Sequence, residues 1–381
     1  MRILVKTAHP DMPTAYAQQT ALLVPRLAAA GHDMAISCTA GQLSHHSFWR
    51  GIPVFGCTPY TETGEDTVRE DYDAWKADLV VTFLCTWTLA VPHLWRDMRV
   101  IHLTPVDCDP MSWRDYAVVC ETGGTPAAVS RTGERIMRAG WDLDPARKRE
   151  PLSPLLLPHG TDTKTFQPPK DRAGLREGMG FGGKFVTGMN FMNNDKFRKN
   201  IQEAIRGWAM FHAKHPGDTL LALHAIQQLP EGYNLPAYCR FLGIDSAVRW
   251  TPQYELKAGM IPPPVLAEWY GALDVLIGAG NEGYGLPAIE SQACGTPVIL
   301  GDWSTGPELV GDGWLVSGHR WYNDVHCADW WNAHPDSICE ALEEAYEDAR
   351  NRREAARDNA LRHDIGRMVR DHWEPVLGEL G

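Results

Sequence analysis

Residues Glu282–Glu290 read EGYGLPAIE and follow a short apolar stretch, Asp274–Gly278, which reads DVLIG. An uninterrupted apolar run bounded by turn residues is typical of a buried strand. Gly283 and Gly285 then allow the backbone to turn sharply and to approach a ligand closely. Pro287 is favoured at the first position of a helix, where an N–H group would have no partner. The stretch therefore predicts a strand, a glycine loop and the start of a helix.

Such a loop is a favourable place for an anion. It offers backbone N–H groups and the positive end of a helix dipole, and phosphate is the usual occupant. Glu282 and Glu290 cannot bind that anion, because a carboxylate only accepts hydrogen bonds. They suit neutral hydroxyls on either side of a diphosphate, such as those of a sugar and a ribose. The alternative is an ordinary strand, turn and helix with two surface glutamates.

The spacing of the two glutamates, with seven residues between them, resembles the E-x7-E motif of retaining family 4 glycosyltransferases. Two segments downstream are similar to the same family: SQACGTPVIL at Ser291–Leu300 and GPELVGDG at Gly306–Gly313. The resemblance implies an α/β protein of the GT-B type, with two Rossmann-like doubly wound domains that face each other across a cleft. The expected domains are residues 1–168 with a crossover helix at 365–381, on the acceptor side, and residues 169–364, on the nucleotide-sugar side.

Composition agrees with a globular protein of two domains, because 381 residues exceed what one hydrophobic core usually serves. The net charge of -12 argues against nucleic acid or an anionic membrane surface as the main partner. Polar residues interrupt the longest apolar stretch, at residues 79–95, so no stable membrane span is expected. The N-terminus lacks a secretory leader, and the nine cysteines are scattered without C-x-x-C spacing. These features predict a cytoplasmic protein without a disulfide framework or a zinc site.

The chain begins with a strand at Arg2–Thr7, a helix at Tyr16–Ala30 and a strand at Met34–Ser37. Strand, helix and strand in this order open a parallel α/β sheet. The first loop and helix resemble the family, except that Ala15 and Ala17 stand where many relatives have glycine. Their side chains narrow the approach of a ligand to this loop.

The next strand of interest is Arg99–Thr104, within the text RVIHLTPVD, which ends at Asp107. Ligands of open parallel sheets bind beyond the carboxyl ends of strands, and Asp107 lies there. Family members place a histidine or a Pro-Val-Asp sequence near this point, facing the donor sugar. The resemblance makes Asp107 the first candidate for that role and His102 the second. Alternatively, Asp107 caps a turn and His102 is a core residue with its hydrogen bonds satisfied.

In the second half, a strand at Lys184–Met189 and a helix at Ile201–Ala213 enclose a loop that carries Arg198 and Lys199. Positive side chains at a helix N-terminus oppose the helix dipole, and a bound anion would reverse that cost. The family holds the donor diphosphate here with an arginine and a lysine six residues apart. Lys199 matches the lysine. Asn193 stands at the arginine position, so the resemblance leaves Arg198 or Lys196 as the substitute.

Further along, a proline-rich segment at 150–170 predicts an extended connection between domains. Strands are expected at 220–224 and 247–250, and nothing in their loops identifies a nucleotide base. After Gly313 the chain is rich in tryptophan, then helical at 337–362, and 365–380 resembles the helix that returns to the first domain.

The resemblance implies transfer of a sugar, of the hexosyl type, from a nucleoside diphosphate sugar to a hydroxyl of a glycan, protein or small molecule, with retention of anomeric configuration. No cofactor or metal is expected, since cations and backbone dipoles would stabilise the leaving diphosphate. The expected donor-sugar contacts are Asp107, Glu282 and His102; the diphosphate contacts are Arg198, Lys199, Gly283, Tyr284, Gly285 and Leu286; and the ribose contact is Glu290.

Two other classes remain open from the sequence. A sugar-nucleotide epimerase of similar two-domain shape would bind the same donor and make product without an acceptor. A catalytically degenerate nucleotide-sugar-binding protein would bind nucleotide without turnover, and the departures at Ala15, Ala17 and Asn193 fit it. The paired Glu282 and Glu290 argue against both alternatives.

Overall fold

The computed structural model describes residues 1–41, 45–58, 60, 61 and 63–381. The chain forms two compact units. Unit 1 comprises Met1–Gly160, Asn323–Ala328 and Ile365–Gly381, and unit 2 comprises Thr161–Tyr322 and Asp329–Asp364. The sequence placed the boundary at 168/169, whereas the structure divides the chain at 160/161. Residues 323–328, which the sequence placed in the second domain, group with unit 1.

Unit 1 is built on an eight-stranded sheet in the order β3-β4-β2-β1-β5-β6-β7-β8. Every neighbouring pair is parallel except β3 and β4. The central strands are buried on both faces, which explains their continuous apolar text. The strands are β1 (Arg2–Thr7), β2 (Asp33–Cys38), β3 (Ser47–Trp49), β4 (Ile52–Phe55), β5 (Leu79–Phe83), β6 (Val100–Thr104), β7 (Thr125–Ala128) and β8 (Leu155–Leu156).

Helix α1 of unit 1 begins and ends at residues that the capping rules favour. Thr14 caps α1 by accepting a hydrogen bond from the backbone N–H of Ala17. Gly31, with φ of 98°, takes the left-handed conformation just after that helix. The helices are α1 (Ala15–Ala29), η1 (Glu65–Thr67), α2 (Val68–Trp75), η2 (Thr86–Thr88), η3 (Pro92–Trp95), α3 (Trp113–Thr122), α4 (Arg131–Ala139) and η4 (Pro145–Arg147).

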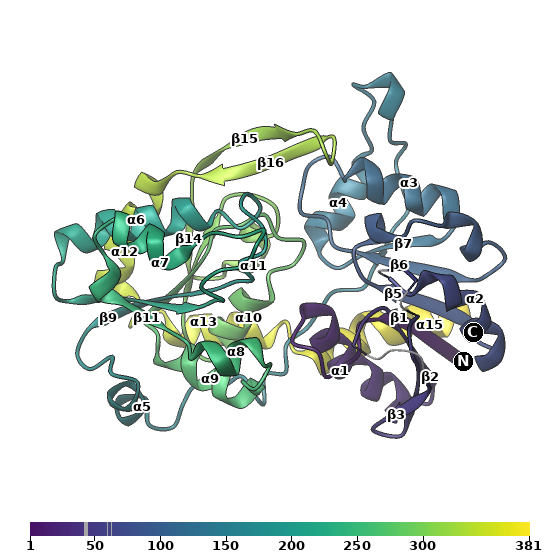
Figure 1. The fold of residues 1–381 in the computed structure, drawn as a ribbon, viewed down its shortest axis with the longest axis horizontal. Coiled ribbons are helices and arrows are strands. Elements are labelled where there is room, and N and C mark those ends of the chain that lie inside the picture. The colour runs from purple at the N-terminus through teal and green to yellow at the C-terminus, as the bar shows by residue number, and fades with distance from the viewer. Residues whose placement is uncertain (42–44, 59, 62) are drawn as a thin grey trace. The chain divides into compact units, whose positions relative to one another are not determined.

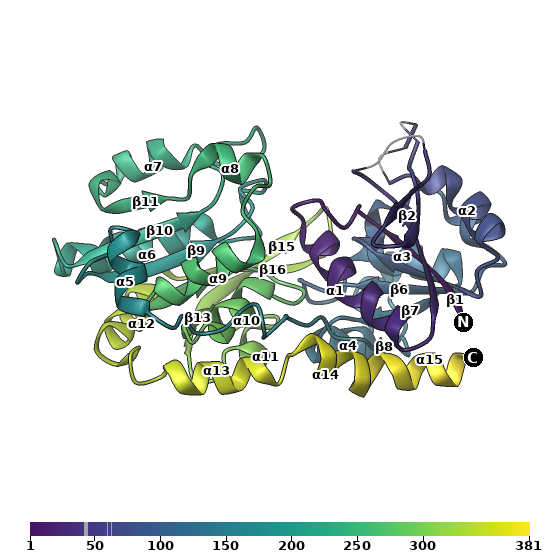
Figure 2. The same cartoon turned by 90° about the horizontal axis from the view of Figure 1, so that it is seen from below.

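The C-terminal segment of unit 1 is helical, as the sequence predicted. It consists of α14 (Ile365–Met368), a π-helical turn (Val369–Trp373) and α15 (Glu374–Leu380), which Figure 2 shows as one continuous yellow rod. Trp373 is 1% exposed and its ring stacks on Phe83 of β5, with centroids 6.3 Å apart. Burial of one large aromatic side chain thus anchors the end of the chain on the first sheet.

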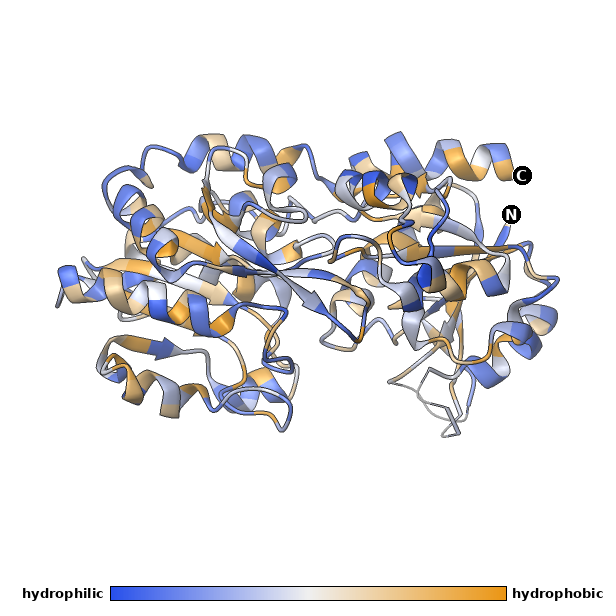
Figure 3. Ribbon diagram, turned by 90° about the horizontal axis from the view of Figure 1, so that it is seen from above, coloured by the Kyte–Doolittle hydropathy of each residue, from blue (hydrophilic) through white to orange (hydrophobic). Residues whose placement is uncertain are grey.

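Unit 2 is built on a six-stranded sheet in the order β11-β10-β9-β12-β13-β14, with all neighbouring pairs parallel. Trp208 and Phe211 of α6 pack with Ile338 and Leu342 of α12 in the core beside this sheet. In Figure 3 the strands carry long orange segments and the helices alternate orange with blue, as amphipathic helices do. The strands are β9 (Phe185–Asn190), β10 (Thr219–His224), β11 (Val248–Trp250), β12 (Val275–Gly278), β13 (Val298–Gly301) and β14 (Trp314–Val316).

The predicted helix at 337–362 is wrong in one respect, because the structure contains two helices there. Asp348 accepts hydrogen bonds from the side chains of Asn351 and Arg352, and these bonds close the turn that separates the two helices. The turn lets Arg353 donate to the carbonyl oxygens of Gly271 and Leu273. The helices of unit 2 are α5 (Arg172–Gly178), α6 (Ile201–Lys214), α7 (Leu235–Phe241), η5 (Asp245–Ala247), α8 (Gln253–Lys257), α9 (Pro263–Ala272), α10 (Leu286–Ala293), α11 (Gly306–Leu309), α12 (Pro335–Asp348) and α13 (Arg353–Leu361).

The tryptophan-rich segment after Gly313 is a hairpin that the sequence analysis did not predict. Strands β15 (Gly318–Asn323) and β16 (Ala328–Ala333) form their own two-stranded sheet, drawn as a long ribbon in Figure 1. Trp330 and Trp331 are 5% and 3% exposed, so these side chains serve the core of the protein.

Candidate active site

The order of the strands in unit 2 fixes where a ligand binds. Strands β9, β10 and β11 follow one another in one direction across the sheet, and β12, β13 and β14 in the other. The direction reverses between β9 and β12, and ligands of open parallel sheets bind at the carboxyl end of such a switch point. The loops that leave these two strands carry the residues predicted to contact the donor, at 191–200 and 279–285.

The glycine loop has the predicted form. Gly285, with φ of 104°, lies directly before α10, and only glycine adopts this conformation readily. The loop approaches its neighbour closely, because a Cβ on Gly280 would stand 3.1 Å from the Cα of Lys199. Pro287 occupies the second helical position rather than the first, which also requires no N–H donor.

Three of the predicted side chains meet in one ion cluster. Glu282 accepts a hydrogen bond from the Lys199 ammonium, and the Arg198 guanidinium lies 3.5 Å from its other carboxylate oxygen. The side chain of Glu282 is 26% exposed. Burial acts to raise the pKa of Glu282, but the two cations hold this pKa below its ordinary value. Glu282 is therefore a charged counter-ion to Arg198 and Lys199, a contact that the sequence analysis did not foresee.

Two buried asparagines join the loops that carry this cluster. Asn281 donates from its amide to the carbonyl oxygens of Arg198, at 3.1 Å, and Trp331, at 2.9 Å, and accepts from the Trp331 backbone N–H at 2.9 Å. Asn200 donates to the carbonyl oxygens of Ala279, at 2.7 Å, and Trp331, at 3.1 Å. Strand β16 thus fixes both loops through the backbone of one residue, Trp331, whose carbonyl oxygen accepts from both asparagines. The signal in the sequence was an asparagine beside each charged motif, and the hairpin partner could not be predicted.

Asn193, at the position of the family's arginine, has a structural role. It is 0% exposed and donates to the carbonyl oxygens of Ile226, at 3.0 Å, and Tyr233, at 2.8 Å. Lys196 is exposed, and its carbonyl oxygen accepts from the Tyr233 hydroxyl. Of the two substitutes for the missing arginine, only Arg198 lies in the ion cluster.

Glu290 lies in the second turn of α10 and is 6% exposed, so it is not a surface glutamate. Its carboxylate accepts a hydrogen bond of 2.9 Å from the Tyr270 hydroxyl. Burial raises the pKa of Glu290 to about 7, and the hydrogen bond from Tyr270 acts in the opposite direction.

The remaining residues of the glycine loop contribute through their backbones. The Tyr284 side chain is 4% exposed and its hydroxyl contacts His363 Nδ1 at 3.1 Å. The hydroxyl of Thr305 donates to the carbonyl oxygens of Glu282, at 3.1 Å, and Tyr284, at 2.7 Å. These hydrogen bonds fix the loop conformation from which Gly283, Gly285 and Leu286 were predicted to contact a diphosphate.

In unit 1 the two candidates differ sharply. His102, in β6, is 0% exposed and contacts the hydroxyls of Thr82, at 3.2 Å, and Thr122, at 2.8 Å. Burial lowers the pKa of His102 to about 4, so this imidazole is neutral. The structure therefore gives His102 the core role that the sequence left open. Asp107 lies beyond the end of β6 and is half-buried, and it keeps its place as a candidate.

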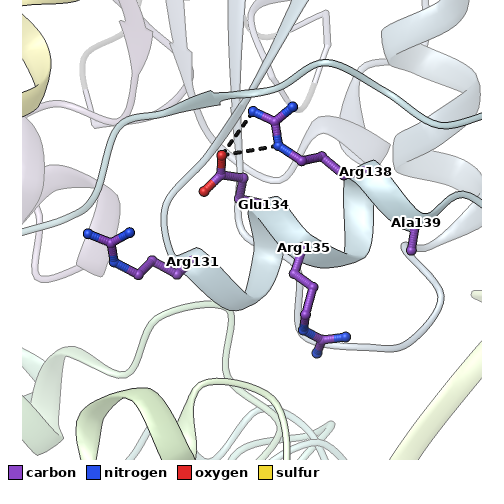
Figure 4. A pocket seen from close by; sticks show the side chains of 5 residues that line it. All are labelled: Arg131, Glu134, Arg135, Arg138 and Ala139. Carbon is purple, nitrogen blue, oxygen red and sulfur yellow. Dashed lines mark hydrogen bonds and ion pairs between the residues drawn. The ribbon is translucent and has the colours of Figure 1, made fainter.

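A surface hollow lies on α4, and the residues that line it include none of these candidates. Figure 4 shows Arg131 and Arg135 extending from the helix while Glu134 pairs with Arg138 at 2.9 Å.

Across the described parts of the chain, no group of three or more His, Cys, Asp or Glu side chains is arranged to hold a metal ion. The described helices also include none that is long and apolar enough to cross a membrane.

Comparisons with known proteins bear on the fold and the class of protein. No family model matches the chain. A D-inositol 3-phosphate glycosyltransferase of Acidothermus cellulolyticus is 33% identical over 181 residues, which are 45% of this chain and 38% of that protein. The chain therefore matches well under half the length of this curated relative.

Solved structures extend the likeness to the whole chain. A sucrose-phosphate synthase from Thermosynechococcus elongatus has a TM-score of 0.74 at 16% identity, covering 100% of both chains. Anabaena HepE in complex with UDP-glucose has a TM-score of 0.72 at 15% identity, covering 99% of this chain and 100% of that one. The fold is therefore GT-B, and the predicted resemblance to family 4-like glycosyltransferases is confirmed.

Proposed function

We propose that the protein is a retaining glycosyltransferase that moves a hexosyl group from a nucleoside diphosphate sugar to an acceptor hydroxyl. The observation that carries the proposal is the ion cluster at the switch point of unit 2. There, Arg198 and Lys199 lie beside the loop that opens α10, and Glu282 is paired with both. Cations and a helix N-terminus at one point are suited to a diphosphate.

Each group has a role in this proposal. Arg198, Lys199 and the backbone N–H groups of residues 283–286 stabilise negative charge on the leaving diphosphate, which is preorganised electrostatic catalysis. Glu282 exchanges its cation partners for sugar hydroxyls when the diphosphate binds. Glu290 accepts hydrogen bonds from the ribose, and Asp107 is the candidate for a contact with the donor sugar. His102 is not assigned to the site, because its imidazole is fully buried.

The donor is of the nucleoside diphosphate class. HepE, which shares the fold, has been crystallised with UDP-glucose, so UDP-hexoses are the first donors to test. The acceptor is a glycan, protein or small molecule. We place the enzyme in the cytoplasm, which agrees with cysteines that are all free thiols.

The proposal is tested with purified protein, a panel of UDP-, GDP- and ADP-hexoses, and candidate acceptors, with products analysed by mass spectrometry and NMR. We expect an acceptor gain of one hexose with retained anomeric configuration. Product that forms without an acceptor would identify an epimerase instead. Tight nucleotide binding without any turnover across the panel would identify a binding protein.

Metal dependence belongs to the same experiment. Because Arg198 and Lys199 supply the positive charge at the diphosphate, turnover is expected to survive EDTA at millimolar excess. Activity that EDTA abolishes and magnesium or manganese restores would overturn the assigned electrostatics.

A further inference from the structure

Glu290 accepts a hydrogen bond from a buried tyrosine, Tyr270, that the sequence analysis did not identify. The ring of Tyr270 lies in α9 and is 0% exposed. Its hydroxyl lies 2.9 Å from Glu290 Oε2 on one side and 2.6 Å from Asn190 Nδ2 on the other. The phenol thus joins the last residue of β9, a strand beside the switch point, to the second turn of α10, the helix that follows β12 on its other side.

The direction of each hydrogen bond follows from the chemistry of the groups. The Asn190 Nδ2 group can only donate, so the Tyr270 oxygen accepts from it. The hydroxyl proton of Tyr270 is therefore directed to Glu290. Burial keeps the pKa of Tyr270 well above its ordinary value, so this proton stays on the phenol.

The second carboxylate oxygen of Glu290 is left for a ligand. Among the residues that the structure describes, Tyr270 is the one hydrogen-bond donor to the Glu290 carboxylate. The charged or titratable groups that act on these two side chains are each other and the Cys294 thiol, one turn further along α10. Tyr270 is thus the group that favours the ionised form of Glu290 within an otherwise apolar site.

We propose that Tyr270 is a positioning residue for the nucleotide: with Asn190 it orients the Glu290 carboxylate toward the ribose and stabilises the charged form of that carboxylate by the hydrogen bond it donates. The proposal rests on the proposed function, in which Glu290 accepts from ribose hydroxyls. A ribose diol donates two hydrogen bonds, and a charged, fixed carboxylate accepts them far better than a neutral acid. Affinity for the nucleotide then depends on Tyr270, which no ligand atom needs to touch, because Tyr270 acts through the orientation and ionisation of Glu290.

The test is the pH dependence of nucleotide binding. Isothermal titration calorimetry from pH 5.5 to 9 would compare the parent with Tyr270→Phe and Glu290→Gln, with UDP, GDP and ADP as probes. In the parent, affinity rises with pH as Glu290 ionises, with a midpoint near its pKa of about 7. Loss of the donated hydrogen bond raises the pKa of Glu290, so Tyr270→Phe should move the midpoint up by about one pH unit.

Two controls make the result specific. The terminal phosphate of each nucleotide titrates with a pKa of about 6. Because glutamine does not titrate, the pH dependence of binding that remains in Glu290→Gln measures the contribution of this phosphate. Tyr346→Phe, a matched change in α12, should leave the midpoint unchanged. Asn190→Ala, which keeps the phenol but removes its donor, should shift the midpoint in the same direction by a smaller amount.

The outcomes separate the two proposals. A Tyr270→Phe midpoint equal to that of the parent, with Glu290→Gln binding weakly, would overturn the positioning role and leave the nucleotide site intact. Parent-like binding by Glu290→Gln would instead remove Glu290 from the site and overturn the proposed function. If Tyr270→Phe fails to fold, the same comparison is made with Asn190→Ala, whose unchanged midpoint would also overturn the role of Tyr270.

Discussion

The two glutamates of one loop and helix occupy opposite environments. Glu282 is paired with two cations, which hold its pKa below the ordinary value, whereas Glu290 faces a phenol in a buried site that raises its pKa to about 7. One carboxylate is charged at any working pH, and the other is balanced between its two forms. The spacing of the motif therefore predicts where the two carboxylates lie, whereas the groups packed around each carboxylate determine its ionisation state.

The largest effect on nucleotide affinity is predicted for the buried glutamate, Glu290. Glu290→Ala removes the acceptor for two ribose hydroxyls, which should cost on the order of 2–4 kcal/mol in nucleotide binding. Affinity for the best nucleoside diphosphate should fall at least tenfold by calorimetry. Because Tyr270 loses its acceptor, we also expect the free energy of unfolding to fall by about 1 kcal/mol.

Glu344→Ala is the matched control, because Glu344 is an exposed glutamate of α12. It should leave both binding and stability within about 0.5 kcal/mol of the parent. A folded Glu290→Ala variant that binds nucleotide like the parent would show that the buried carboxylate is only structural.

The charged end is tested next, through Lys199. A charge-assisted hydrogen bond is worth about 1.5–3 kcal/mol, so Lys199→Ala should weaken nucleoside diphosphate binding by roughly ten- to a hundredfold. Binding of the bare nucleoside should barely change, because it lacks the diphosphate. Lys196→Ala, an exposed lysine of the same loop, should change neither. Equal weakening of nucleoside and nucleotide would mean that Lys199 holds the loop rather than the phosphate.

These two tests concern residues that the sequence could identify, and the reason is local. The strand, glycine loop and helix of residues 274–293 follow from the apolar run, Gly285 and Pro287, all within one short segment. Arg198 and Lys199 were assigned from their place before a predicted helix and from the resemblance to the family. The strand and the helix, whose formation depends on neighbours close in the chain, were predicted correctly in kind and nearly in position.

What the sequence missed depends on contacts between distant segments. The hairpin β15–β16 contains Trp331, whose backbone groups form hydrogen bonds with Asn281, 50 positions away in the chain. No periodicity links those residues, nor Tyr270 with Asn190, 80 positions apart. The break between α12 and α13 depends on side-chain hydrogen bonds of Asp348, which compete with the helix and carry no pattern of their own.

A smaller effect sharpens the view of Glu282 as a counter-ion. Since Glu282 neutralises Lys199, a diphosphate must displace its carboxylate and then tolerate its charge nearby. Glu282→Gln removes that charge with little change in size, so nucleoside diphosphate affinity should rise by roughly fivefold, about 1 kcal/mol. Transfer to an acceptor should fall, because the amide is a weaker acceptor for sugar hydroxyls. Glu203→Gln, in the first turn of α6, is the control and should change neither quantity.

The outcome that would contradict this view is weaker binding in Glu282→Gln. It would mean that the ion cluster is needed to hold Lys199 and Arg198 in place, so that the carboxylate acts as a support for the cations. Calorimetry with the nucleoside diphosphate and a turnover assay with the sugar donor together distinguish two roles of the Glu282 carboxylate. In one role it competes with the diphosphate for the cations, and in the other it holds the cations in place.

The smallest effect on function is predicted for His102, which contrasts with Asp107 three positions past the end of β6. His102→Gln leaves the surface of unit 1 unchanged, because the imidazole is 0% exposed, and it keeps an amide that can still reach one of the two threonine hydroxyls. We expect the free energy of unfolding to fall by about 1–3 kcal/mol, since one buried hydrogen bond and some packing are lost. Because the imidazole has a pKa of about 4, it does not change charge between pH 6 and 9, so the pH profile of turnover should match that of the parent.

Asp107→Asn should instead keep the stability of the parent and lose turnover. A His102→Gln variant that folds, binds the donor like the parent and yet loses turnover would return His102 to the donor-sugar site and show that β6 must move to expose it.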